Sequence, residues 1–377
     1  MSKSKLTALV LSSAMLFSGC AVKGEETIYI GALAPMTGVS SAYGSACASG
    51  IRLAVNEINE NGGILGKQLV VDIQDEKGGI EESINAYNKL VGNGADIIIG
   101  DVMSKPCLAI TELAIEDGTL VITPAATAEG ITENGGNIFR VCFTDDIQGK
   151  IMARYTADDL DAEKVAVMYN ISDDYSEGIF SSFCAELEKL GIIPDSIFGY
   201  GNDDKDFRVQ LSKIIAKSPD VIFVPDYYPN AALIVSQARE LGYSGKILGA
   251  DGWDGILSAV SEKNMDILDD CRYSAHYSPD DENPVVAHFV KRYEKEYGKT
   301  PTSLAALGYD TVYIIKAAIE KANSTDKNKV AEAMHEIEAI CVTGNISFDE
   351  NGNPIKEVSV ISLSGGEPSL DTKKESL

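Results

Sequence analysis

Residues 96–127 read DIIIGDVMSKPCLAITELAIEDGTLVITPAAT, and this stretch decides the fold of the chain. It predicts a strand over 96–100, a helix over 106–116 and a second strand over 120–123. The unbroken apolar run Ile97-Ile98-Ile99 is typical of a strand buried on both faces, as in a parallel sheet. A strand, a helix and a strand in this order predict an α/β unit with the helix crossing over the sheet.

The same alternation extends in both directions from this stretch. Before it, strands are expected at 28–34 and 70–74 and helices at 46–59 and 81–91. After residue 164 the pattern restarts, with strands expected at 165–169, 192–198, 221–224 and 246–248 and helices at 176–190, 207–217 and 231–241. Two doubly wound sheets in tandem are therefore predicted.

The last hundred residues are mostly helical in pattern, with helices expected at 285–297, 303–322 and 329–340. Two strands, 345–348 and 358–363, are expected to pair around the acidic turn 349–353. Helices without strands cannot form a further α/β lobe, so we expect some of them to cover the first sheet. The chain would then cross between lobes near 140–146, 271–276 and 343–348.

The fold class predicted is therefore α/β, with two doubly wound Rossmann-like lobes joined by a multi-strand hinge. The first lobe is expected to hold residues 27–143 plus 275–343, and the second 144–274 plus 344–377. A cleft between two such lobes is a common place for a small ligand.

Residues 1–20 are typical of a secretory signal peptide: Lys3 and Lys5 precede an apolar run over 6–17, and Cys20 follows Ser18 and Gly19. The ending is similar to a bacterial lipobox, which predicts lipidation of Cys20 and an extracytoplasmic protein anchored to the bacterial membrane. An ordinary cleaved signal is the alternative. No other run reaches the roughly 18 apolar residues of a membrane span.

Composition excludes several classes of protein. The 377 residues hold 32 Lys and Arg against 57 Asp and Glu, and a net charge of −25 makes nucleic acid an unsuitable partner. No GxGxxG, GxSxG or HExxH motif occurs, so no catalytic residue, cofactor or metal site is predicted. Of the histidines, His276 lies near a proposed crossing, where a position in the cleft is possible.

The cysteines other than Cys20 stand singly, without CxxC spacing, in apolar or helical surroundings. We expect buried free thiols, although an exported protein can form disulfides. They are Cys47, Cys107, Cys142, Cys184, Cys271 and Cys341.

Two neighbouring strands of the first unit end in similar turns, Gly100 to Ser104 and Thr123 to Thr127. Ligands of open α/β sheets bind at such strand ends. The hydroxyls of Ser104 and Thr127, with backbone N–H groups near helix starts, predict a cradle for a carboxylate. The Ala125 carbonyl could accept a hydrogen bond from an ammonium group. Helix capping alone would also explain both hydroxyls.

The second unit offers the opposite chemistry at its own strand ends. Asp251 follows the strand at 246–248 and could pair with an ammonium across the cleft, although a turn residue is the alternative. Tyr175 and Tyr227 would supply aromatic walls. Together, the hydroxyl donors of the first unit and the carboxylate of the second are complementary to the two charges of a zwitterion.

These residues resemble the substrate-binding proteins of branched-chain amino acid ABC transporters, the leucine/isoleucine/valine-binding group with a type I periplasmic-binding fold. The similarity runs over residues 27–363, and its specific pieces are 30–38 with Tyr43-Gly44, 61–67, 123–128, Phe139-Arg140, 249–253 and 344–352. It implies a ligand site formed by Tyr43, Ser104, Ala125, Ala126, Thr127, Tyr175, Tyr227 and Asp251. Asp251 stands where the best-known members have Glu.

The resemblance implies a lipid-anchored receptor that delivers an amino acid, an aliphatic one favoured, to the permease of an ABC transporter. Trp253, with Tyr43 and Tyr228, is expected to line the pocket for the ligand's side chain. We expect a monomer. A sensory receptor, or a site for an amide or an aromatic acid, is the alternative.

Overall fold

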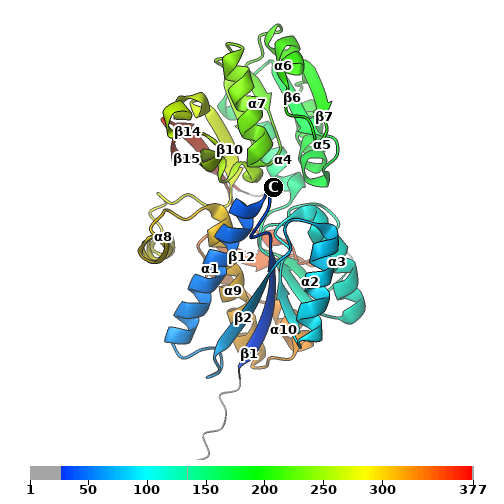
Figure 1. Ribbon diagram of the computed structural model, residues 1–377, viewed down its shortest axis with the longest axis vertical. Coiled ribbons are helices and arrows are strands. Elements are labelled where there is room, and N and C mark those ends of the chain that lie inside the picture. Colours follow the sequence, from blue (N-terminus) through cyan, green and yellow to red (C-terminus); the bar gives the residue numbers. More distant parts are fainter. Residues whose placement is uncertain (1–26, 134, 376–377) are drawn as a thin grey trace, which may run out of the picture.

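The computed structural model describes residues 27–133 and 135–375, which form two α/β lobes placed end to end (Figure 1). The first lobe has a parallel sheet in the order β2-β1-β3-β4-β5. Its strands are β1 (Ile28–Ala34), β2 (Leu69–Asp75), β3 (Ile97–Ile99), β4 (Leu120–Thr123) and β5 (Ile138–Arg140). All three residues of β3 are buried, as the apolar run predicts.

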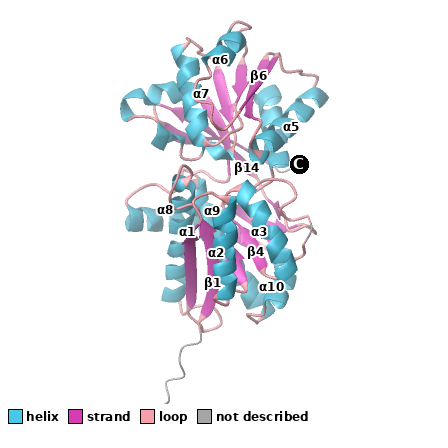
Figure 2. Cartoon of the chain, turned by 45° about the vertical axis from the view of Figure 1, so that its right-hand side comes forward, coloured by secondary structure: helices cyan, strands magenta, loops and turns pink. Residues whose placement is uncertain are grey.

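Helices cover both faces of this sheet, and two of them come from the C-terminal part of the chain (Figure 2). They are α1 (Ser41–Glu60), α2 (Ile80–Gly92), α3 (Ser104–Asp117), α9 (Ser303–Ala322) and α10 (Lys327–Met334). Helix α8 (Pro284–Tyr297) also joins this lobe, since Phe289 packs against Tyr309 and Arg292 pairs with Glu57. The expectation that late helices return to the first lobe is confirmed.

The second lobe is built on a seven-stranded sheet in the order β15-β14-β10-β9-β8-β6-β7. Its strands are β6 (Val165–Asn170), β7 (Ser196–Tyr200), β8 (Val221–Phe223), β9 (Lys246–Gly249), β10 (Cys271–Ala275), β14 (Val358–Ser364) and β15 (Glu367–Lys374). Its helices are α4 (Asp145–Arg154), α5 (Asp174–Lys189), α6 (Arg208–Ile215) and α7 (Tyr228–Glu240), with short turns η1 (Tyr155–Asp159), η2 (Asp251–Trp253), η3 (Ile256–Ala259) and η4 (Glu262–Leu268).

The third crossing between the lobes lies further along the chain than expected. Strand β12 (Gly344–Phe348) pairs with β11 (Ala339–Cys341) and β13 (Pro354–Ile355), and Phe348 packs on Phe139 of the first lobe. Residues 344–355 therefore belong with the first lobe, and the chain crosses at 355–358. The boundary expected at residue 344 and the expected pairing of 345–348 with 358–363 are both wrong. Strand β14 pairs instead with β10 and β15.

The cysteines within the described residues are free thiols, and all but Cys184 are buried. Burial raises the pKa of the Cys47, Cys107 and Cys271 thiols to about 12, so these thiols are protonated and unreactive. Cys20 lies outside the described residues. None of the described helices is long and apolar enough to span a membrane.

Helices α1 and α9 touch backbone to backbone, because each carries a glycine at the crossing. A β-carbon on Gly50 would overlap the carbonyl oxygen of Ala305, and one on Gly308 would overlap the carbonyl oxygen of Cys47. Neither obstacle is a flexible side chain, so the helices would have to separate to admit a methyl group. This contact holds the N-terminal half of α1, which includes Tyr43, against the start of α9.

We expect Gly50→Ala to lower the free energy of unfolding by about 2–3 kcal/mol, since overpacking against backbone atoms forces the helices apart. Urea denaturation followed by circular dichroism measures it. The matched control is Gly92→Ala at the end of α2, where an added β-carbon meets nothing within 4 Å. A Gly50 variant as stable as the Gly92 variant would contradict the close contact of α1 with α9.

Candidate functional site

The candidate site is a small cavity between the lobes, at the C-terminal ends of the parallel strands of both sheets. About 320 Å³ of space lies between its walls, part of it open to solvent. It is lined by Tyr43, Val102, Met103, Ser104, Ala125, Thr127, Tyr175, Tyr227, Asp251, Gly252 and Leu304. The structure thus brings together most of the residues predicted to bind the ligand.

The first-lobe wall is formed by the start of α3 and by residues 123–128, which we call the cradle loop. The Ser104 hydroxyl oxygen accepts hydrogen bonds from the backbone N–H groups of Thr127 and Ala128, each at 3.3 Å. Its proton is therefore available to a ligand. The Thr127 hydroxyl is buried and has no hydrogen-bond partner among the described residues. Two hydroxyl donors at the positive end of α3 suit a carboxylate.

One residue, Arg140 of β5, holds the shape of the cradle loop from beneath. Its guanidinium is 1% exposed and donates to the carbonyl oxygens of Thr127 at 2.8 Å, Ala128 at 2.9 Å and Ala126 at 3.4 Å. Three successive carbonyls are thereby turned away from the cavity. Within the loop, Thr123 Oγ1 accepts from the N–H groups of Ala125 and Ala126. The loop is therefore fixed before a ligand arrives.

The second-lobe wall centres on Asp251, which begins η2 directly after β9. Its Oδ1 accepts from the Tyr175 hydroxyl at 2.7 Å, and its Oδ2 lies 3.0 Å from His276 Nε2. The Tyr175 ring stacks on Tyr227, with 4.6 Å between the ring centroids. A carboxylate held in an aromatic wall, opposite two hydroxyl donors, creates a site with opposite polarity at its two ends.

Tyr43 joins the two lobes across the mouth of the cavity. Its hydroxyl donates to the Gly252 carbonyl and accepts from the Tyr228 backbone N–H at 3.1 Å, and both partners lie in the second lobe. A second contact runs from the Leu304 backbone N–H at the start of α9 to Asp254 Oδ2, at 3.2 Å. The structure therefore shows the lobes closed over the site.

Burial keeps the three aromatic hydroxyls at the site protonated. It raises the pKa of Tyr43, Tyr175 and Tyr227 well above the ordinary value of a tyrosine. Burial also lowers the pKa of His276 to about 4, so its imidazole is neutral at neutral pH. Asp251 therefore faces neutral donors, and a positively charged group is what the second-lobe wall lacks.

Three of the residues expected to form the site lie outside the cavity, which corrects the sequence-based expectation. Ala126 is fully buried, and its side chain packs in the core of the first lobe. Trp253 is also fully buried, and its Nε1 donates to the Val224 carbonyl at 2.9 Å. Tyr228 contributes its backbone N–H to Tyr43 and does not line the cavity.

Sequence reasoning missed several lining residues. Val102 and Met103 lie in the turn before Ser104. Because Ser104 was itself a predicted site residue, these neighbours could have been predicted to line the cavity. Leu304 enters from α9, far away in sequence, and nothing in its surroundings marks it. All three are apolar and give the cavity a wall suited to an aliphatic group. Within the described residues no cluster of side chains could hold a metal ion.

Residues 27–367 match the model of a family described as periplasmic binding protein. The chain is 31% identical over 357 residues to a Leu/Ile/Val-binding protein, BraC3, of Rhizobium johnstonii, covering 92% of this chain and 93% of that protein. It is also similar to the leucine-binding protein LivK of Thermotoga maritima, with 34% identity, a TM-score of 0.84 and coverage of 93% and 99%.

A further similar structure is LivJ of Streptococcus pneumoniae, a branched-chain amino acid transporter substrate-binding protein solved in complex with isoleucine. It is 29% identical, with a TM-score of 0.86, and the match covers 93% of this chain and 99% of that one. Each match covers both lobes of this chain.

Proposed function

Since this chain belongs to the periplasmic binding protein family and has its type I fold, we propose that it captures a free amino acid between its lobes and delivers it to an ABC importer. One observation carries the proposal: Ser104 and Thr127 offer hydroxyl donors on one wall, and the Asp251 carboxylate faces them from the other lobe. A zwitterion satisfies both walls at once.

The carboxylate of the amino acid is placed on the Ser104 and Thr127 hydroxyls, and its ammonium group on Asp251 and the Ala125 carbonyl. Charge-assisted hydrogen bonds of this kind are about twice as strong as neutral ones. The side chain of the ligand then meets Val102, Met103 and Leu304. Because these residues are apolar and the cavity is small, leucine, isoleucine and valine are the ligands we favour.

Closure of the lobes follows from this division of contacts. In an open protein the carboxylate meets the first lobe alone, and only closure brings Asp251 to the ammonium. A ligand that binds the closed state better shifts the population toward it. We propose that the closed monomer is what the permease recognises, since one chain completes the whole site.

A thermal-shift screen of the wild type with the standard amino acids, their amides and benzoate tests the ligand class. A ligand at about 100 times its dissociation constant adds about 2.7 kcal/mol to the stability of the folded protein. We expect leucine, isoleucine and valine to raise Tm, and benzoate to leave it unchanged because benzoate has no ammonium for Asp251. A rise with benzoate and none with any amino acid would overturn the proposal.

We also propose that the mature protein is anchored by a lipid on Cys20, which lies outside the described residues. Support comes from the sequence alone, in the apolar run that ends at Ser18-Gly19-Cys20. In a bacterial host, we expect the wild type in the membrane fraction and Cys20→Ser outside it, with incorporation of labelled palmitate in the wild type only. Equal labelling of Cys20→Ser would contradict the anchor.

A further inference from the structure

We propose that His276 is a positioning residue for Asp251, and that it makes an α-ammonium group a condition for tight binding. The inference rests on the proposed function, because it concerns how the same site selects amino acids. His276 follows β10 directly and stands in the crossing from the second lobe to the first. It is not among the residues that line the cavity, and among the described residues its side chain hydrogen-bonds to Asp251.

The contact between the two side chains determines which ring nitrogen of His276 carries the proton. His276 Nε2 lies 3.0 Å from Asp251 Oδ2, and an ionised carboxylate can only accept a hydrogen bond. Nε2 must therefore carry the proton, and the imidazole donates it to Asp251. The ring is held in place by Phe143 of the first crossing, which stacks on it with 3.8 Å between centroids and 23° between planes.

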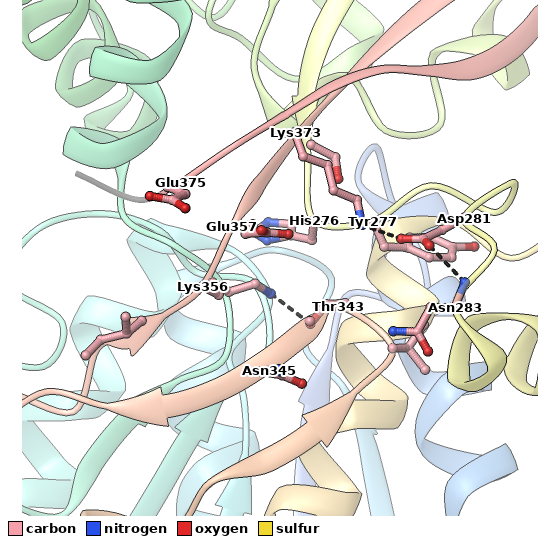
Figure 3. A pocket seen from close by; sticks show the side chains of 14 residues that line it. His276, Tyr277, Asp281, Asn283, Thr343, Asn345, Lys356, Glu357, Lys373 and Glu375 are labelled. Atoms are coloured by element: carbon pink, nitrogen blue, oxygen red, sulfur yellow. Dashed lines mark hydrogen bonds and ion pairs between the residues drawn. The ribbon is translucent and has the colours of Figure 1, made fainter.

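The other ring nitrogen, Nδ1, is buried and has no hydrogen-bond partner among the described residues. His276 also lines a second cavity, on the hinge side of the molecule, which is drawn in Figure 3. Lys356 lines the same cavity and donates to Thr343 Oγ1 at 2.7 Å. Because no donor among the described residues reaches Nδ1, the Nε2–H tautomer that donates to Asp251 is the favoured one.

The charged groups around the ring support the same state. Asp251 lies on the cleft side, and Lys356 stands on the hinge side with Glu357 and the paired side chains of Asp281 and Lys373. Burial is the largest reason for the lowered pKa of His276, and the positive charge of Lys356 acts in the same direction. The imidazole is thus a neutral donor that does not compete with a ligand's ammonium for the charge of Asp251.

Two donors fix the Asp251 carboxylate, one on each oxygen: the Tyr175 hydroxyl on Oδ1 and His276 on Oδ2. The plane of the carboxylate is thereby set before the ligand arrives, which lowers the cost of binding. If His276 were apolar, Oδ2 would be a buried oxygen without its donor, and the carboxylate would be free to turn. That change weakens the bond to an ammonium group.

Paired substitutions separate this role from simple packing. His276→Leu fills the space without a donor, whereas His276→Gln places an amide N–H at the position of Nε2. Titration calorimetry measures the affinity of each variant for leucine and for 4-methylpentanoate, which is leucine without its amino group. We expect His276→Leu to weaken leucine binding by about tenfold and 4-methylpentanoate binding by less than about twofold, and His276→Gln to stay within about threefold of the wild type.

Equal losses of both ligands in His276→Leu would overturn the inference, because a structural defect does not discriminate between them. Nitrogen-15 NMR of the wild-type imidazole provides a test without a variant: we expect the neutral Nε2–H tautomer, and a protonated Nδ1 would contradict the proposal. The wild-type titration with leucine separates the proposed function from the positioning role of His276. If the wild type does not bind leucine, the proposed function is rejected. If the wild type binds leucine and His276→Leu binds it equally well, the positioning role alone is rejected.

Discussion

Replacing Asp251 by alanine is expected to weaken leucine binding by about tenfold or more. Asp251 is 8% exposed, and among the described residues it is the one acidic residue that lines the cavity. Its loss leaves the ammonium of the ligand in a closed, poorly hydrated cleft without a counter-charge, and a charge-assisted bond of this kind is worth at least about 1.4 kcal/mol, or a factor of about ten. Titration calorimetry measures the change.

Asp251→Asn keeps the shape of the side chain and removes only its charge, so it is expected to lose a similar factor. The matched control is Asp203→Ala, an exposed aspartate of the same lobe, which should bind leucine as the wild type does. Unchanged affinity in both Asp251 variants would remove this residue from the site. Unfolding midpoints of the variants, measured in parallel, separate loss of binding from loss of structure.

Arg140→Met is expected to have the largest effect on stability of the substitutions considered. The guanidinium is buried and bonds three carbonyl oxygens of the cradle loop, and methionine fills much of the space but satisfies none of them. A buried polar group left unsatisfied costs about 1–3 kcal/mol, so a loss of about 3 kcal/mol or more is expected. Denaturation in urea measures it.

Leucine affinity should fall in the same variant, because the loop that carries Ala125 and Thr127 is no longer fixed. Arg208→Met serves as the control, since Arg208 is half-exposed and its ion pairs with Asp206 and Glu240 lie on the surface. Its unfolding midpoint and its leucine affinity should stay at the wild-type values. If Arg140→Met matched Arg208→Met in both measurements, the cradle loop would not depend on Arg140.

Much of the fold was predictable because the parallel strands leave a clear signal. Strands β1 and β4 and helix α9 have the expected bounds, and strands β2, β3, β6, β7, β8 and β9 were expected within a few residues. Ile97–Ile99 is the extreme case, since a strand buried on both faces needs apolar residues at every position. Local pattern and tertiary burial agree in these elements.

In the elements that the sequence did not predict, the local residue pattern does not reflect the burial of the strand. Strand β10 includes Arg272 and Ser274, and β15 alternates between exposed and half-exposed residues, so neither shows an apolar run. Their partners decide their structure: β14 lies between them and pairs with both. The error in the third crossing has the same origin, because β12 finds its neighbours within the first lobe. Pairings between distant segments leave no mark in either segment alone.

In the site, the polar residues were easier to predict than the apolar ones. A hydroxyl or carboxylate at the end of a strand is unusual in sequence, so Ser104, Thr127 and Asp251 stood out. Trp253 was misplaced because η2 turns tightly: two residues after Asp251 the chain faces the core, and the indole bonds Val224 and not a ligand. Leu304 depends on the return of α9, which no local pattern places beside Met103.

The central claim is that the cleft binds a zwitterion, and a calorimetric titration of the wild type with three ligands tests it most directly. L-leucine meets both walls, leucinamide lacks the carboxylate for Ser104 and Thr127, and 4-methylpentanoate lacks the ammonium for Asp251. We predict one leucine per chain with a dissociation constant of about 1 μM or lower, and a loss of about tenfold or more for each of the other two. No heat with leucine, or equal affinity for all three ligands, would contradict the account.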